Sequence, residues 1–380
     1  MSYSRTLAWL TAALVVATAV AAAVATGAPV ARADDDRKRE PIVIAHRGAS
    51  GDRPEHTLAA YEHAINFGAD YIEPDLVSTK DGVLVARHEN EISGTTDVAS
   101  HPEFASRQTT KTIDGVPTTG WFTEDFTLAE LKTLRAKERI PALRPNNTAF
   151  DGLYEVPTLQ EVIDLAKSRG VGIYPETKHP TYFDSIGLSL EEPLVETLKL
   201  NGWSKKRAPV FIQSFEVANL KELNRMIDVP IVQLLNGGGK PYDFVVAGDP
   251  RTYADMAKPA GLKEIAKYAD GIGPFKNLIV PRNAANQLQA PTTLIKDAHK
   301  AGLVVHAWTF RNENEFLAAD HRQGNPASPF YRSATGNSAA EYELFYELGL
   351  DGVFSDNTDS AVAARERVFA KGDNDDEDDD

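Results

Sequence analysis

The chain has 380 residues, 42% of them hydrophobic and 25% charged, which is typical of a globular protein and unlike a disordered chain. Its formal net charge of -15 argues against nucleic acid as a partner, because nucleic-acid-binding proteins carry basic patches. The absence of cysteine excludes disulfides, thiolate metal sites and cysteine nucleophiles. The length suits either one barrel with an insertion or two domains.

The two ends of the chain differ in composition from the rest. Arg5 precedes a long apolar run, and residues 31–33 form a small-residue cleavage pattern directly before three aspartates. This order predicts a signal peptide over residues 1–33, and hence a secreted or periplasmic protein with no stable membrane insertion after cleavage. An uncleaved membrane anchor is the alternative, since about 18 apolar residues can span a bilayer. The acidic run at 371–380 predicts a solvated, disordered tail.

Between these ends, short apolar runs alternate with amphipathic helical stretches. Eight runs are predicted as strands: Ile42–Ala45, Tyr71–Leu76, Val171–Glu176, Val210–Ser214, Pro230–Leu234, Gly271–Pro274, Val304–Thr309 and Gly352–Ser355. Capping signals mark helices between them, one from Thr57 to Gly68 and one from a Thr158–Glu161 capping box to Gly170. Alternating strands and helices in this number predict an α/β fold, a (β/α)8 TIM barrel over residues 41–366.

Two stretches interrupt the alternation. Asp81-Gly82 predicts a hairpin that extends the second strand. The following residues, 90–156, are too many for a plain loop and predict an inserted subdomain after the second strand, with one helix opened by a capping box at Thr127. A second stretch, 236–257, contains three consecutive glycines without the spacing of a phosphate-binding loop, and is predicted to be a flexible loop.

The carboxyl ends of the predicted strands carry polar residues: His46 and Arg47, Glu73 and Asp75, Glu176 and Lys178, Gln213 and Ser214, Trp308 and Thr309, and Ser355 and Asp356. Active sites of (β/α)8 barrels lie at this edge, so these side chains are expected to meet there. Glu73, Asp75 and Glu176 offer oxygen ligands of the kind that suit Mg²⁺ or Ca²⁺. The alternative is a structural ion network of these carboxylates with Arg47 and Lys178.

Two histidines are candidates for proton transfer. His46 and His88 each lie directly after a strand, and imidazoles with a pKa near ~6.5 serve as general base and acid. A histidine more often has a structural or surface role, and we expect that of most others in this chain. His306 lies inside the seventh predicted strand as a candidate core residue, while His56 and His179 are open to either interpretation.

Taken together, these motifs resemble the glycerophosphodiester phosphodiesterase family. The matching stretches run in order from residue 42 to 358: His46-Arg47-Gly48, Pro54-Glu55-His56-Thr57, Glu73-Pro74-Asp75-Leu76, Arg87-His88-Glu89, Tyr174-Pro175-Glu176-Thr177-Lys178, Gln213-Ser214-Phe215, Trp308-Thr309-Phe310 and Asp351 to Asp356. The insertion after His88 resembles that of the secreted and periplasmic branch. One position departs from the family pattern, because His56 stands where an asparagine is usual.

The resemblance implies hydrolysis of glycerophosphodiesters to sn-glycerol 3-phosphate and an alcohol. It implies one divalent cation on Glu73, Asp75 and Glu176, with Ca²⁺ favoured over Mg²⁺, and a catalytic pair at His46 and His88. Substrate binding is assigned to the remaining strand-end residues Arg47, Lys178, Gln213 and Trp308. Two alternatives remain open: a phosphodiesterase of the same barrel type acting on lysophospholipids or phosphoinositides, and a non-catalytic binding protein of the same fold.

Overall fold

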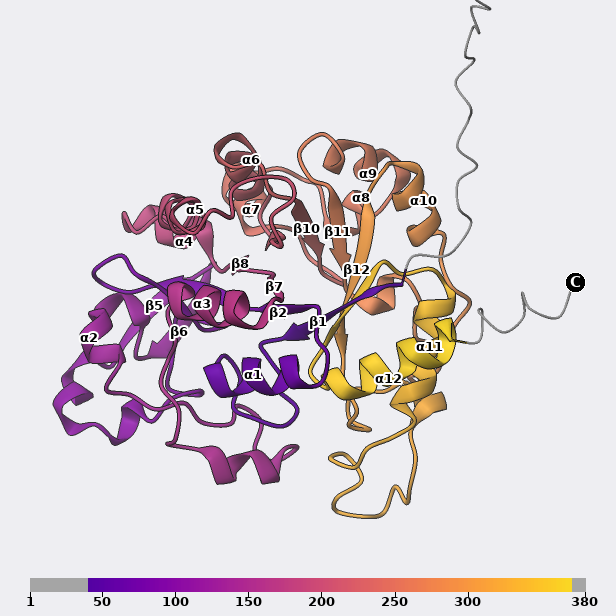
Figure 1. Cartoon of the computed structure of the whole chain (residues 1–380), viewed down its shortest axis with the longest axis horizontal. Helices are drawn as coiled ribbons and strands as arrows, with labels where there is room; N and C mark the ends of the chain where they lie inside the picture. The colour runs from indigo at the N-terminus through magenta and orange to yellow at the C-terminus, as the bar shows by residue number, and fades with distance from the viewer. Residues whose placement is uncertain (1–39, 371–380) are drawn as a thin grey trace, which may run out of the picture. The chain divides into compact units, whose positions relative to one another are not determined.

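The computed structural model describes residues 40–370, so the predicted signal peptide at 1–33 and the predicted tail at 371–380 lie outside the described residues. The strands are β1 (Ile42–His46), β2 (Tyr71–Glu73), β3 (Asp75–Ser78), β4 (Leu84–Ala86), β5 (Thr109–Ile113), β6 (Val116–Gly120), β7 (Gly172–Ile173), β8 (Glu176–Thr177), β9 (Ile212–Ser214), β10 (Ile231–Leu235), β11 (Gly271–Pro274), β12 (Val304–Phe310) and β13 (Gly352–Ser355). Figure 1 shows their succession along the chain.

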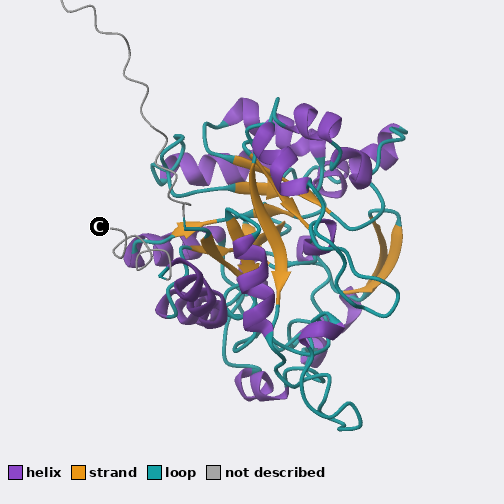
Figure 2. Ribbon diagram, turned by 90° about the vertical axis from the view of Figure 1, so that its right-hand side faces the viewer, coloured by secondary structure: helices purple, strands orange, loops and turns teal. Residues whose placement is uncertain are grey.

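Helices alternate with these strands and surround them (Figure 2). They are α1 (Leu58–Asn66), α2 (Leu128–Leu131), α3 (Leu159–Arg169), α4 (Pro180–Ser185), α5 (Glu191–Leu200), α6 (Val217–Met226), α7 (Tyr242–Ala247), α8 (Tyr253–Met256), α9 (Pro259–Ile265), α10 (Leu294–Lys300), α11 (Ser338–Glu347) and α12 (Thr358–Phe369). None of the described helices combines the length and the hydropathy needed to cross a membrane.

The parallel sheet is curled, and its pairings follow the chain order. β1 pairs with β2, β2 with β7, and β3 with β8, after which β8 to β13 pair in succession and β13 returns to β1. An isolated parallel bridge from Ile173 to Val210 joins β7 to the segment before β9. Every predicted strand is therefore present in a parallel α/β sheet.

Prolines explain where the observed strands differ from the predicted ones. The predicted strand Tyr71–Leu76 is divided at Pro74 into β2 and β3, and Val171–Glu176 is divided at Pro175 into β7 and β8. A proline has no backbone N–H to donate to the ladder, so regular pairing stops at each one. Both divisions come directly before residues of the candidate site.

The predicted helix ends are confirmed. Thr57 accepts a hydrogen bond from the Ala60 backbone N–H at the start of α1. Capping boxes open α2 at Thr127 and α3 at Thr158, and α3 ends at Gly170 in the left-handed conformation that glycine adopts readily.

The segment between β4 and α3 has its own short elements. The predicted hairpin around Asp81-Gly82 is present as the antiparallel pair β3–β4. Beyond it, the structure adds a second hairpin, β5–β6, which the sequence analysis did not predict. Phe126 and Leu131 of this segment belong to the main hydrophobic core, and Phe122 is also buried.

The prediction of a flexible loop over 236–257 is wrong in part. Residues 236–241 and 248–252 are irregular, but α7 and α8 also lie within this stretch. Thr252 and Asp255 form a capping box at the start of α8, a signal that was present in the sequence. Inside the curled sheet, four buried side chains pack together: Ile44, Val232 and Phe354 from three strands, and Tyr174 from the link between β7 and β8. This cluster supports the floor of the cavity described next.

Candidate active site

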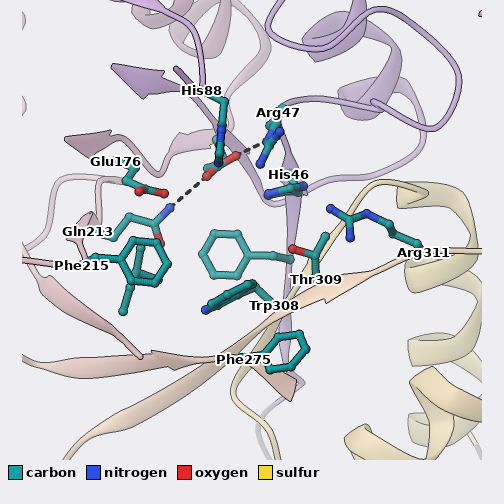
Figure 3. Close-up of a pocket in the computed structure, with 13 residues that line it drawn as sticks. His46, Arg47, His88, Glu176, Gln213, Phe215, Phe275, Trp308, Thr309 and Arg311 are labelled. Carbon is teal, nitrogen blue, oxygen red and sulfur yellow. Dashed lines mark hydrogen bonds between the residues drawn. The ribbon is translucent and has the colours of Figure 1, made fainter. Parts of the chain in front are cut away.

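A cavity of about 510 Å³ lies at the carboxyl ends of the strands (Figure 3). Its lining is His46, Arg47, Glu73, His88, Glu176, Gln213, Phe215, Leu234, Phe275, Trp308, Thr309, Arg311 and Phe354. Strand register assembles it, because Glu73 pairs with His46, and Glu176 pairs with both Asp75 and Gln213. The structure therefore brings seven of the twelve strand-end residues named from the sequence into the lining of this cavity, whereas Asp75, Lys178, Ser214, Ser355 and Asp356 do not line it.

Three carboxylates form a buried cluster. Glu73, Asp75 and Glu176 each offer an oxygen, and these oxygens lie within 4.8 Å of one another. Burial and the neighbouring charges of Asp75 and Glu176 raise the pKa of Glu73 well above its usual value. Burial also raises the pKa of Glu176 to about 8, even though Lys178 Nζ donates to it at 2.8 Å.

Asp75 behaves differently from its two partners. Burial opposes its ionisation, but Lys178 and a hydrogen bond from His56 hold the pKa of Asp75 well below its usual value. Its Oδ1 is buried without a hydrogen-bond partner. Buried carboxylate oxygens are normally paired, so this oxygen, the shared geometry and the repulsion among the three acids fit a divalent cation with oxygen ligands.

His46 is held from behind by a carboxylate. Its Nδ1 lies 2.6 Å from Asp356 Oδ1, and Asp356 Oδ2 accepts hydrogen bonds from Arg144 and Arg311 at 2.6 and 2.7 Å. The Asp356 carboxylate accepts a hydrogen bond from Nδ1–H, which leaves Nε2 of His46 as the basic nitrogen. Burial, with the charge of Arg47, lowers the pKa of His46 to about 4, so the imidazole is neutral at pH 7.

His88 has a matching arrangement on the other side of the cavity. Its Nδ1 is hydrogen-bonded to Glu89, and its Nε2 accepts a hydrogen bond from Lys178 Nζ at 3.2 Å. Glu89 is in turn paired with Arg139 at 2.7 Å. Burial, with the charges of Arg47 and Lys178, lowers the pKa of His88 to about 3.

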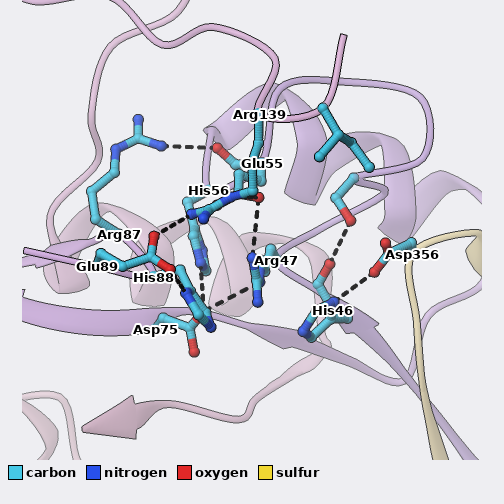
Figure 4. Close-up of polar contacts among 12 residues, drawn as sticks. His46, Arg47, Glu55, His56, Asp75, Arg87, His88, Glu89, Arg139 and Asp356 are labelled. Carbon is cyan, nitrogen blue, oxygen red and sulfur yellow. Dashed lines mark hydrogen bonds and ion pairs between the residues drawn. The ribbon is translucent and has the colours of Figure 1, made fainter. Parts of the chain in front are cut away.

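Arg47 is fixed by a network of acids (Figure 4). Its backbone N–H donates to Glu73 at 2.8 Å, its Nη1 to Glu55 at 3.2 Å, and its Nε lies 3.4 Å from Asp75. Glu55 also accepts two hydrogen bonds from Arg139, at 2.8 and 2.6 Å. The guanidinium of Arg47 is thereby held beside the carboxylate cluster, where it lines the cavity.

His56 occupies a fully buried position behind the carboxylates. Its Nε2 lies 2.8 Å from Asp75 Oδ2, and its Nδ1 lies 2.8 Å from the hydroxyl of Tyr61. The imidazole therefore hydrogen-bonds to a candidate metal ligand and does not line the cavity. The two interpretations that the sequence left open are decided in favour of a supporting role.

The other assigned substrate-binding residues surround the cluster. Gln213 Nε2 donates to Glu73 at 3.0 Å, and Lys178 joins Glu176 to His88. Trp308 donates to the carbonyl of Gly273 at 2.8 Å and packs against the rings of Phe275 and Phe215. One side of the cavity is thus charged and the opposite side is aromatic.

Sequence reasoning missed the residues that hold the two imidazoles. Asp356 stood among the strand-end residues, and a carboxylate at the end of the eighth strand, next to the first in a closed barrel, was a usable signal for a partner of His46. Arg139 and Arg144 carry no such signal, because they lie in the long segment between β4 and α3. Their approach to Glu55 and Asp356 depends on tertiary folding.

A parallel α/β sheet with three clustered carboxylates, an arginine and two neutral imidazoles at one edge offers the groups that metal-assisted hydrolysis with acid–base catalysis uses. Residues 46–360 match the glycerophosphoryl diester phosphodiesterase family. The chain belongs to this family, which confirms the assignment made from the ordered motifs, including that it is an enzyme of this kind.

Curated relatives support the assignment over most of their length. The chain is 39% identical to a glycerophosphodiester phosphodiesterase of Arabidopsis thaliana over 84% of each chain. It is 32% identical to a glycerophosphodiester phosphodiesterase of Haemophilus influenzae, over 74% of this chain and 82% of that protein.

Solved structures agree in fold. A glycerophosphoryl diester phosphodiesterase from Silicibacter pomeroyi matches with a TM-score of 0.58 at 19% identity, covering 88% of this chain and 94% of that one. A phosphodiesterase from Oleispira antarctica, solved with the product sn-glycerol-3-phosphate, matches with a TM-score of 0.56 at 22% identity, covering 85% of this chain and 96% of that one.

Proposed function

We propose that this chain hydrolyses glycerophosphodiesters to sn-glycerol 3-phosphate and an alcohol, inside a closed (β/α)8 barrel with residues 90–156 inserted after the second strand. The observation that carries the proposal is a cluster of three carboxylates, two of which line one cavity together with two neutral imidazoles. The family match and the product-bound relative support the choice of substrate. The complete residue set argues against a non-catalytic binding protein.

Glu73, Asp75 and Glu176 are the residues that would hold a divalent cation, and Ca²⁺ is favoured over Mg²⁺. When bound, such a cation supplies positive charge to the phosphate oxygens of the substrate. The unpaired Asp75 Oδ1 and the high pKa of Glu73 support this assignment, because a cation would offset both the desolvation and the mutual repulsion of the acids.

Arg47 and Lys178 are proposed to bind the phosphate. Lys178 is buried and Arg47 is partly buried, and each is already held by carboxylates, so little conformational freedom is lost when an anion binds. Their charges stabilise the more anionic transition state of the transfer. Gln213 and Trp308 complete the substrate contacts, with the indole forming an apolar wall for the glycerol carbons.

His46 is proposed as the base and His88 as the acid. In the first step, Nε2 of His46 takes the proton from the attacking glycerol 2-hydroxyl, and Nε2 of His88 protonates the departing alkoxide. In the second step the roles swap: His88 takes a proton from the attacking water, and His46 returns its proton to the glycerol 2-oxygen as the cyclic phosphate opens. The anionic phosphate offsets the charges of Arg47 and Lys178 that lower the pKa of His88, so substrate binding favours the protonated, acidic form.

We also propose that residues 1–33 are a signal peptide and that the enzyme acts outside the cytoplasm. N-terminal sequencing of protein recovered from culture medium or periplasm tests this directly. A mature chain that begins at Asp34 supports the proposal, and a chain that retains Met1 contradicts it.

A coupled assay for sn-glycerol 3-phosphate tests the activity, run over a panel of glycerophosphodiesters with Ca²⁺ or Mg²⁺. We expect turnover that is lost after dialysis against EDTA and restored by the ion. His46→Ala and His88→Ala should each abolish turnover with an unchanged circular dichroism spectrum, whereas the control His101→Ala, outside the cavity, should not. Full activity after exhaustive chelation, or in either histidine variant, would refute the proposal.

A further inference from the structure

A second cavity, of about 1020 Å³, lies beside the candidate active site. The two cavities share Glu176 and Phe215 in their walls. Lys178, which donates to His88 Nε2, lines the second cavity, whereas His46, His88 and Trp308 line only the first. Lys178 therefore connects the second cavity to the histidine that we assign as the acid.

The turn of the hairpin β5–β6 contributes Asp114 to the wall of this cavity. Asp114 and Gly115 form this turn, with positive φ angles of 48° and 81°. Asp114 Oδ2 lies 2.6 Å from His179 Nδ1, and a Cβ placed on Gly115 would lie 3.7 Å from the ring of Tyr242. The long segment after β4 thus reaches across to α4 and α7 and bounds the space next to the reaction centre.

Among the charged side chains that line the second cavity, the acid Glu216 has no basic partner within the described residues. The basic side chains are already bonded, Lys178 to Glu176 at 2.8 Å, Lys240 to the carbonyl of Asp249 at 2.8 Å, and His179 to Asp114 at 2.6 Å. Glu216 is only 3% exposed and accepts a hydrogen bond from the Thr181 hydroxyl. Within the described residues, no lysine, arginine or histidine forms an ion pair with its carboxylate.

A buried carboxylate without a cation is unfavourable, and its surroundings increase the penalty. Burial, together with the charges of Asp114 and Asp243, raises the pKa of Glu216 to about 8. A positively charged ligand group would offset this penalty. The rings of Phe215 and Tyr253, with centroids 6.1 Å apart, line the same cavity, and aromatic rings also attract ammonium groups.

We propose that the second cavity is the subsite for the departing alcohol and that it takes a cationic head group, whose ammonium is bound by Glu216. This inference rests on the proposed function. As the phosphorus–oxygen bond to the head group breaks, the leaving alkoxide oxygen takes the proton from His88. The head group then leaves into this cavity as an amino alcohol, with an uncharged hydroxyl and a positively charged ammonium. A neutral head group fits the same space without the charge contact.

Two esters of sn-glycerol 3-phosphate that differ only in charge test the subsite. One carries choline, and the other carries 3,3-dimethylbutanol, in which carbon replaces the quaternary nitrogen. We expect kcat/KM of the wild type to favour the choline ester about 10-fold, the effect of one ammonium–carboxylate contact. Glu216→Gln should lower the ratio several-fold, to the small preference that the aromatic rings alone provide. Glu222→Gln, an exposed acid on the same helix, should keep it.

The ratio does not depend on the fraction of folded enzyme, so a loss of stability in the Glu216 variant cannot imitate the result. A wild-type ratio near one, or an equal loss for both esters in Glu216→Gln, would overturn the subsite while leaving the phosphodiesterase activity in place. Failure of the wild type to hydrolyse either ester would overturn the proposed function, and the subsite with it.

Discussion

Replacing Asp356 by asparagine tests how the candidate base is held. The carboxylate is 2% exposed and accepts three hydrogen bonds, one from His46 and two from Arg144 and Arg311. An asparagine keeps the volume but offers one oxygen in place of two. Hydrogen bonds from charged donors contribute about 1.5–3 kcal/mol each, more than those from neutral donors, so the arginines should retain the oxygen. The amide NH2 then faces His46.

This reversal moves the proton of His46 to the wrong nitrogen. Nδ1 must accept from the amide, so Nε2 carries the proton and cannot act as a base toward the cavity. A positioned general base contributes about 10²–10⁴-fold, so we expect kcat of Asp356→Asn to fall by about that factor, or ~2.7–5.4 kcal/mol of transition-state stabilisation. KM should change little, because Asp356 does not line the first cavity.

The assay measures kcat by release of sn-glycerol 3-phosphate, alongside thermal unfolding by circular dichroism. Glu313→Gln is the matched control, since Glu313 pairs with Arg144 at 2.6 Å and is as buried as Asp356 but does not contact His46. Equal losses of kcat in the two variants, or a loss of less than about threefold in Asp356→Asn, would refute the reasoning.

Three further changes have defined outcomes. Glu176→Gln should weaken Ca²⁺ binding more than about 10-fold by isothermal titration calorimetry, because one of three charged ligands is lost; unchanged affinity would exclude a role for Glu176. Burial lowers the pKa of His306, which is hydrogen-bonded to Tyr174, to about 4. Below pH ~6.5 the unfolded chain therefore binds a proton at this histidine that the folded chain does not. The free energy of unfolding should fall by up to about 1.4 kcal/mol per pH unit between pH ~6.5 and 4. Urea unfolding of His306→Phe should show a shallower decline, and an identical slope would contradict this. Gly48→Ala should destabilise the fold by more than about 1 kcal/mol in the same urea assay, since φ is 85° and the new Cβ would lie 2.7 Å from Ala60; unchanged stability would show that this turn relaxes freely.

The fold was predictable because its signals are local. Apolar runs of strand length, threonine caps and the glycine at 170 each determine an element within a few residues, and alternation of the elements predicts a parallel sheet. The hairpin β5–β6 was not predicted, although Asp114-Gly115 is a typical hairpin turn sequence. Its two strands are mostly exposed, so apolar and polar residues do not alternate clearly along them.

The carboxylates and imidazoles of the site were predictable for a different reason. They follow strands, and parallel strands bring their carboxyl ends to one edge, so position in the sequence translates directly into position in space. Arg139, Arg144 and Glu216 lie outside the strands, where no periodicity restricts the backbone. Their approach to the site is set by tertiary packing, which a single sequence does not encode in any short window.

His46 and His88 are held by the same kind of arrangement, in which a carboxylate and an arginine lie behind each imidazole. Nδ1 of each histidine is bonded to a carboxylate, Asp356 for His46 and Glu89 for His88, and each carboxylate is paired with an arginine. The arginine keeps the carboxylate ionised, and the carboxylate fixes the imidazole tautomer so that Nε2 faces the cavity. The surroundings of Nε2 differ, because His88 has a lysine hydrogen-bonded there and His46 does not. That lysine also lines the second cavity, so it connects the proposed acid to the proposed subsite for the departing alcohol.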